Sequence, residues 1–224
     1  MFQGFTEDTV RFFLDLRFHN NTAWFHEHHE EYRKIVVQPF YELIEDLTPA
    51  MLAVDPRLEF RPHKCLSRIN RDIRFTKDKS PYRDHLWFTF RPAGEEREGS
   101  LNFWFEFGPD RLDWGFGFWG ENREVMDTFR RRLEARPQEF IDLARKCDFP
   151  GNRVGLSGRM WKKLAVPESL PEVLRPWYLS RELLLPRMDV DYAQAFRPDL
   201  KDAVEATFLT CAPVYRYLRG MQTE

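Results

Sequence analysis

Apolar residues occur at every second position along two stretches near the middle of the chain, Leu101–Phe107 and Arg111–Trp119. The apolar positions are Leu101, Phe103, Phe105 and Phe107 in the first stretch, and Leu112, Trp114, Phe116 and Phe118 in the second. A period of two residues is typical of β-strands that bury one face. The turn residues Gly108–Asp110 join the two stretches, and the apolar run from His85 to Phe90 precedes them. We therefore predict an antiparallel meander of three strands.

Helical periodicity, with apolar residues three or four positions apart, occurs on both sides of this meander. The predicted N-terminal helices are Thr6–Leu16, Thr22–Tyr32 and Arg33–Ala53, and the predicted C-terminal helices are Asn122–Ala135, Pro137–Cys147 and Asp199–Leu218. Pro39 should kink the third helix or start a new segment, because proline lacks the amide proton that a helix interior needs. The chain is thus predicted to be an α+β protein in which N-terminal and C-terminal helices cover the antiparallel sheet.

The stretch between the last two predicted helices gives weaker signals. Phe149–Gly151 has turn residues, Pro167–Leu174 could form a short helix, and Trp177–Leu185 fits a strand or a helix. Residues Gly155–Leu164 match no regular element. At 224 residues the chain is expected to form a single domain over 1–224, in which 148–224 could be a looser C-terminal part.

Positive charge is concentrated between Arg61 and His85. This stretch holds eight arginines and lysines and three aspartates, a local charge of +5, although the whole chain has a formal net charge of −2. Such asymmetry is typical of a site that binds anions, or of a network of internal ion pairs. The weak negative charge of the whole chain argues against a general binder of polyanions.

Within this basic segment, apolar residues at 69, 73 and 75 alternate with polar residues, which favours a strand, and Thr76–Tyr82 then fits a loop. Arginine grips phosphate or carboxylate with two N–H groups, and lysine supplies a point charge. The predicted ligand-binding residues are Arg68, Arg71, Asp72, Arg74, Lys77, Asp78, Lys79 and Tyr82. The alternative is that Arg68 and Arg74 pair with Asp72, Asp78 and acids elsewhere, so that these contacts only hold an irregular loop together.

Gly115 and Gly117 fall on the face of their strand opposite to Trp114 and Phe116. Glycine weakens a strand interior, so two glycines in register need a cause. Either another segment packs closely against them, or a ligand lies on the sheet there. Both glycines are therefore candidate ligand-binding residues, and the candidate site is expected where the 68–82 segment meets this face.

The run Arg68–Arg83, RINRDIRFTKDKSPYR, resembles the signature of an uncharacterised and mainly bacterial family, domain of unknown function 2461. The stretch Asn20–Phe25, followed by Tyr32, and the glycine-rich strand Gly115–Gly117 are also similar to that family. After about Cys147 the family's Arg-Pro-Pro and Gly-Tyr-Asp pattern is not evident. The resemblance implies no mechanism, because the family has no established activity. Catalytic residues therefore stay unknown, and whether the protein is an enzyme stays open.

The cysteines Cys65, Cys147 and Cys211 are far apart and odd in number. This pattern argues against a disulfide scaffold and against a thiolate zinc site, and it suits a cytoplasmic protein. The N-terminus does not resemble a signal peptide, and no stretch is long and apolar enough to span a membrane.

A histidine-rich stretch in the second predicted helix is the other candidate for chemistry. His26 with His29 or Glu30 has the spacing of metal ligands on a helix, but no third ligand is marked by a motif. We expect a charged helix face beside a packed His28, with neither a metal nor a cofactor.

Three functions fit the basic segment. The first is a cytosolic protein that binds a small anion carrying phosphate or carboxylate; there Asp72 and Asp78 would orient the arginines, since a carboxylate among cations is a poor acid. The second is a structural or protein-interaction module whose basic segment is internally ion-paired. The third is single-stranded nucleic-acid binding, because aromatic residues interleave with the cations, although the acidic remainder of the chain disfavours it. The oligomeric state is not predicted.

Overall fold

The computed structural model describes residues 1–147 and 153–221 and holds one four-stranded antiparallel sheet with the order β1-β2-β3-β4. The strands are β1 (Leu86–Phe90), β2 (Asn102–Gly108), β3 (Arg111–Phe118) and β4 (Leu183–Pro186). The three predicted strands are confirmed to within two residues, and the α+β class with N-terminal and C-terminal helices is confirmed. Leu101, Phe103, Phe105 and Phe107 are all fully buried, as their alternation indicated.

The helices before the sheet are α1 (Glu7–Phe18), α2 (Thr22–Glu27), α3 (His29–Glu31), the π-helix η1 (Tyr32–Val37), α4 (Gln38–Val54) and α5 (Pro62–Cys65). Those after β3 are α6 (Arg123–Ala135), α7 (Pro137–Cys147), the 3₁₀ turn η2 (Glu172–Leu174), α8 (Arg175–Leu179), the 3₁₀ turn η3 (Tyr192–Phe196) and α9 (Leu200–Met221). No helix among the described residues combines the length and apolarity that crossing a bilayer requires.

Local chemistry explains where the N-terminal helices begin and end. The Thr6 hydroxyl caps α1 by accepting from the Thr9 amide at 3.3 Å. The predicted helix Thr22–Tyr32 is interrupted at His28, which has a φ of −101° and a ψ of 13°. It resumes as α3, and the π-helical turn begins at Tyr32. Pro39 lies in the first turn of α4, where a missing amide proton costs nothing.

The chain divides into two compact units, of which the first comprises Met1–Phe90, Trp104–Asp113 and Val190–Glu205. Its core is aromatic: the Phe5 ring stacks on Phe107 with centroids 4.2 Å apart, and Phe88 stacks on Phe105 at 5.4 Å. Helices α4 and α5 contact β1. These contacts hold β1, which directly follows the basic segment.

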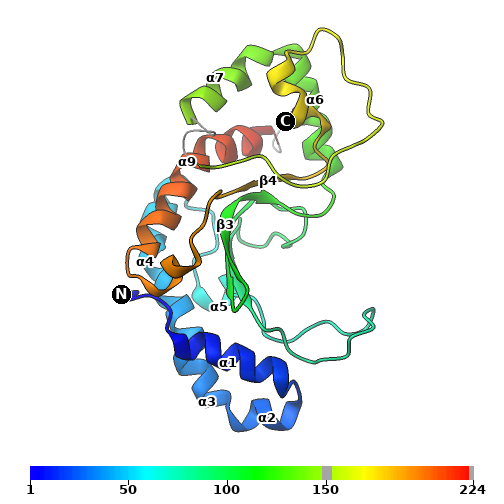
Figure 1. Cartoon of the computed structure of the whole chain (residues 1–224). Helices are drawn as coiled ribbons and strands as arrows, with labels where there is room; N and C mark the ends of the chain where they lie inside the picture. Colours follow the sequence, from blue (N-terminus) through cyan, green and yellow to red (C-terminus); the bar gives the residue numbers. More distant parts are fainter. Residues whose placement is uncertain (148–152, 222–224) are drawn as a thin grey trace. The chain divides into compact units, whose positions relative to one another are not determined.

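The second unit comprises Arg91–Phe103, Trp114–Asp189 and Ala206–Glu224. Here β4 runs antiparallel beside β3, with Gly117 opposite Leu184 (Figure 1). The buried Trp114 donates its indole N–H to the Thr207 hydroxyl of α9 at 3.0 Å. The Phe103 ring lies 5.4 Å from Phe208 of the same helix. The sheet and α9 therefore share one core in this unit.

The stretch that periodicity left undecided contains both kinds of element. Trp177–Leu185 divides into the end of α8 and the start of β4, and only Glu172–Leu174 of the predicted helix Pro167–Leu174 is helical, as a 3₁₀ turn. The stretch Gly155–Leu164, which matched no regular element, lies beside the β4 segment and pairs with it at isolated bridges, including Ser157 with Leu184. The predicted turn Phe149–Gly151 lies outside the described residues.

Candidate functional site

The basic segment folds back on itself in front of β1, within the first unit. The Arg71 amide donates to the Pro81 carbonyl at 2.8 Å, and the Arg83 amide donates to the Ile69 carbonyl at 2.8 Å. These bonds bring residues 69–71 beside 81–83 and leave 72–80 as a projecting tip. The predicted loop Thr76–Tyr82 thus forms most of this tip.

The prediction of a strand through residues 69–75 is wrong, because Asn70 makes only an isolated bridge to Tyr82 and no ladder continues beyond it. Phe75, expected on the apolar face of that strand, is 90% exposed. The reason is local: the Asp72 carboxylate accepts from the Arg74 amide at 3.1 Å, and such side-chain bonds compete with the backbone ladder.

Two ion pairs hold the tip together. The Arg74 guanidinium grips the Asp72 carboxylate with two bonds of 3.0 and 2.7 Å, and these bonds lower the pKa of Asp72 to about 2. Arg71 pairs with Asp78, whose carboxylate also accepts from the Ser80 amide at 2.9 Å. Hydrogen bonding from Ser80, and then from Arg71, lowers the pKa of Asp78. Both carboxylates therefore stay ionised near neutral pH, as expected.

Internal pairing does not account for every cation of the segment. The Lys79 ammonium donates to the Ile73 carbonyl at 2.7 Å, and this neutral acceptor does not balance its positive charge. The Arg68 and Lys77 side chains are exposed and have no hydrogen-bond or ion-pair partner within 1–147 and 153–221. The pairing alternative thus holds for Arg74 and not for Arg68.

A cavity of about 310 Å³ opens beside the tip. Its lining residues are Arg17, Asn20, Arg71, Asp78, Ser80, Tyr82, Arg83, Asp84 and His85. Of the predicted site residues, the structure brings Arg71, Asp78 and Tyr82 together here. The other residues predicted from the basic segment do not line the cavity: Arg68, Asp72, Arg74, Lys77 and Lys79.

Arg83 is the cation that this cavity leaves least compensated. Its guanidinium donates to the carbonyl oxygens of Arg68, at 2.8 Å, and of Asn70, and it lies 4.9 Å from the Trp87 ring centre. Burial, followed by the positive charge of Arg71, lowers the pKa of Arg83. Neutral carbonyls and an aromatic face therefore fix this side chain in place without neutralising it.

The other side of the cavity is a chain of paired groups. Arg17 of α1 donates to the Asp84 carboxylate at 2.7 Å and to Asp110 at 2.6 Å. His85 Nδ1 lies 2.9 Å from the Asp84 carboxylate. Because an ionised carboxylate only accepts hydrogen bonds, this nitrogen carries the proton. Burial acts to raise the pKa of Asp84, but the hydrogen bonds from His85 and Arg17 outweigh it and the pKa is lowered.

Asn20 positions Tyr82 from the turn between α1 and α2. Its side-chain amide donates to the Tyr82 carbonyl at 2.9 Å and accepts from the Tyr82 amide at 3.0 Å, as a neighbouring strand would. The Tyr82 ring stacks on Phe25 at 4.2 Å. These contacts couple the N-terminal helices to the loop that carries the cavity residues.

Six of the lining residues were not predicted from the sequence: Arg17, Asn20, Ser80, Arg83, Asp84 and His85. Arg83 and Asp84 were counted in the charge of the basic segment, and Asn20 in the family resemblance, so a weak signal existed for these three. Nothing in the helical pattern of α1 marked Arg17.

The two candidate glycines lie in β3 of the second unit. Gly117 has a φ of +143°, and a Cβ placed there would lie 1.9 Å from the Leu183 carbonyl oxygen of β4. Gly115 is buried opposite Pro186. At Gly117 the backbone of β4 thus supplies the close packing that the sequence offered as one explanation.

The histidine-rich helix carries an aromatic stack. The His28 ring lies 4.1 Å from the Trp24 ring, and its Nδ1 is 2.8 Å from the Trp24 carbonyl. Within the described residues, no group of three or more histidines, cysteines, aspartates and glutamates has an arrangement that could hold a metal.

Comparison with known proteins identifies the family. The sequence profile of a conserved hypothetical protein family, DUF2461, matches residues 8–217, and so it continues well past Cys147 where the motif resemblance ends. Searches of curated proteins and of solved structures find no significant match. The match spans most of the 224 residues and includes every residue that lines the cavity. The chain therefore belongs to the conserved hypothetical protein family DUF2461.

Proposed function

We propose that this protein binds a small anion, carrying phosphate or carboxylate, in the cavity beside Arg71 and Arg83. The observation that carries the proposal is Arg83, a partly buried cation whose guanidinium donates to carbonyl oxygens. The positive charge of Arg71 acts on it more strongly than the negative charge of Asp72. A desolvated cation whose hydrogen-bond acceptors are neutral is costly. An anion in the cavity would remove that cost, and it would be gripped by planar donors suited to phosphate or carboxylate oxygens.

Arg71 can bind the same anion, although its guanidinium already has an ion-pair partner. It is paired with Asp78, which is exposed and held by Ser80, so an incoming anion competes with a solvated carboxylate. An ion pair to a solvent-exposed carboxylate is weak, so the exchange costs little free energy. Asp78 then acts as an internal competitor that limits affinity.

The proposal concerns binding and assigns no chemical step. The pKa of Asp72 is about 2 and that of Asp78 is also lowered, so neither carboxylate is suited to take up a proton near neutral pH. The buried, unbridged thiols of Cys65, Cys147 and Cys211 support a reducing compartment such as the cytosol.

Two charge-assisted hydrogen-bonded contacts of roughly 1.5–3 kcal/mol each, less the cost of ordering the ligand, predict a dissociation constant of about 1 mM or above for a simple anion. The test is a titration of the full chain with phosphate, sulfate and citrate at constant ionic strength, followed by the ¹H–¹⁵N NMR signals of residues 70–85. We expect saturable shifts of the Arg71, Ser80 and Arg83 amides.

Matched variants separate binding from folding. Arg71→Gln should weaken phosphate binding by about tenfold or more, because it removes one cation and leaves Asp78 facing the ligand. Arg74→Gln breaks the comparable pair with Asp72 outside the cavity, and it should change affinity by less than about twofold. Asp78→Asn keeps the acceptor for Ser80 but frees Arg71, and it should strengthen binding severalfold.

A purely structural segment behaves differently. In that case no anion gives saturable shifts, Arg71→Gln and Arg74→Gln have the same effect, and Asp78→Asn only lowers stability. Any of these three results would refute the proposed anion site.

A further inference from the structure

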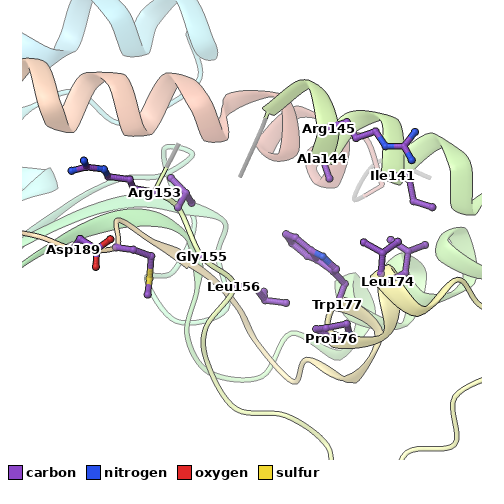
Figure 2. Close-up of a pocket in the computed structure, with 13 residues that line it drawn as sticks. Ile141, Ala144, Arg145, Arg153, Gly155, Leu156, Leu174, Pro176, Trp177 and Asp189 are labelled. Carbon is purple, nitrogen blue, oxygen red and sulfur yellow. The ribbon is translucent and has the colours of Figure 1, made fainter. Parts of the chain in front are cut away.

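The second unit contains a larger cavity, of about 720 Å³, that is separate from the anion site in its lining residues. Its walls come from α7, from residues 153–156 beside β4, and from the turn and helix at 173–177. Figure 2 shows Trp177 in the middle of this space, with Leu156 and Leu174 to either side of it. The volume lies in the range of pockets that hold small organic ligands.

Apolar side chains make up most of the wall. The Trp177 ring is fixed from behind by Phe140, whose ring centre is 4.9 Å away in an edge-to-face contact. Leu174 and Ile141 are buried, at 1% and 9% exposure. These side chains are packed in place before a ligand arrives, so little of the binding free energy would be lost in ordering the wall.

Two further lining side chains are apolar and yet exposed: Val173 at 61% and Met188 at 47%. Met188 lies over Gly155, where an added Cβ would be 2.9 Å from the Met188 sulfur. A thioether side chain adapts its shape to what it covers. Exposed apolar groups around a concave apolar wall indicate a surface that a ligand covers.

The backbone at one end of the cavity is strained. Arg153 and Asp189 have φ angles of 55° and 57°, and within the described residues they are the non-glycine positions with positive φ. Both line this cavity, and the Met188 amide donates to the Arg153 carbonyl between them. Residues held in this region cost about 1–3 kcal/mol each and concentrate at ligand sites.

The few polar groups of the lining favour a negative ligand. Arg145 is 3.5 Å from Asp142 in an exposed pair, and the Arg153 guanidinium has no ion-pair partner in the described part of the chain. Asp189 is the acid among the lining residues, so the lining has a net charge of +1. Figure 2 shows Arg153 and Asp189 toward one end of the space and Arg145 toward the other.

From the apolar wall, the exposed Val173 and Met188 and the positive rim, we infer that this cavity binds an amphipathic carboxylate. The apolar body of the ligand lies against Trp177, Leu156 and Val173, and its carboxylate lies at the rim near Arg153. The inference does not depend on the anion site of the first unit.

Decanoate is the probe, titrated into the full chain labelled with ¹³C at the methionine methyl groups, of which there are six. The Met188 signal is assigned from Met188→Leu. Nine methylene-type groups entering an apolar wall predict a saturable shift of this signal with a dissociation constant of roughly 10–100 μM. Decylammonium, which has the same chain and the opposite charge, should bind at least about threefold more weakly.

Two pairs of variants locate the site. Val173→Asp puts a carboxylate in the wall and should weaken decanoate binding by about tenfold or more, whereas Leu209→Asp changes another exposed apolar residue, in α9 outside the cavity, and should not. Arg153→Gln should weaken decanoate binding by about threefold and leave decanol binding unchanged, whereas the exposed Arg131→Gln should affect neither.

An unchanged Met188 methyl signal would overturn the inference. Equal losses for Val173→Asp and Leu209→Asp would show non-specific adsorption, and equal affinity for decanoate and decylammonium would remove the role of the positive rim. Either of these results also contradicts the proposed ligand.

Discussion

Replacing Gly117 with alanine tests the contact between β3 and β4 most directly. The added Cβ would lie 1.9 Å from the Leu183 carbonyl oxygen and 2.8 Å from the Leu183 carbonyl carbon. Carbon and oxygen approach each other to about 3.3 Å at closest, so β4 would have to move by more than about 1 Å. Such a movement breaks the pairing of Gly117 with Leu184.

The expected loss of stability follows from two terms. A non-glycine residue at a φ of +143° costs about 1–3 kcal/mol in backbone strain. Displacing β4 weakens about two backbone hydrogen bonds, at about 1 kcal/mol each. We expect Gly117→Ala to lower the free energy of unfolding by about 3–5 kcal/mol, read as a lower midpoint in urea unfolding followed by circular dichroism.

Gly94→Ala is the matched control, since Gly94 has a φ of +89° but no atom within 4 Å of the added Cβ. It should cost only the strain, about 1 kcal/mol. If the two variants unfold at the same urea concentration, β4 does not approach Gly117 closely, and the packing explanation for the glycine-rich strand is refuted.

Two more predictions concern Glu59 and Phe75. The Glu59 carboxylate, 7% exposed, accepts from the Arg61 guanidinium and amide, mainly through the side-chain bond, and its pKa falls to about 2 from the usual 4.5. A lowered folded-state pKa stabilises the fold above the unfolded-state pKa, so Glu59→Gln should lose roughly 1–3 kcal/mol above about pH 5, and the difference from the wild type should vanish as the pH falls from about 4.5 to 2. A difference in thermal unfolding that persists at pH 2 would contradict this linkage. Phe75 is 90% exposed, so Phe75→Ser should change the free energy of unfolding by less than about 0.5 kcal/mol; a loss above about 1 kcal/mol in the same urea assay would mean that the tip packs as a strand after all.

The cavity beside Arg71 and Arg83 shows why the candidate site was only partly predictable. Charge density marked the basic segment, and three predicted residues, Arg71, Asp78 and Tyr82, do line the cavity. Arg17 also lines the cavity and bonds to Asp84, although it lies 67 residues earlier in the chain. No local pattern specifies which helix end meets which loop. The role of Arg83 also depends on tertiary structure, because its carbonyl acceptors and its burial come from the folded loop.

The sequence by itself determined the strands β1, β2 and β3 and the longer helices of this protein. Alternating apolar residues from Leu101 to Phe118 have one energetically acceptable arrangement, with one face buried, and caps such as Thr6 and Asn122 act within a single turn of helix. Tertiary structure decided the rest. The strand expected at 69–75 gave way to Asp72 and Asp78 binding nearby amides, since short-range hydrogen bonds win where no sheet partner is available. The pairing of β4 with β3, the close approach at Gly117 and the cavity around Trp177 depend on residues far apart in the chain, and only folding brings these together.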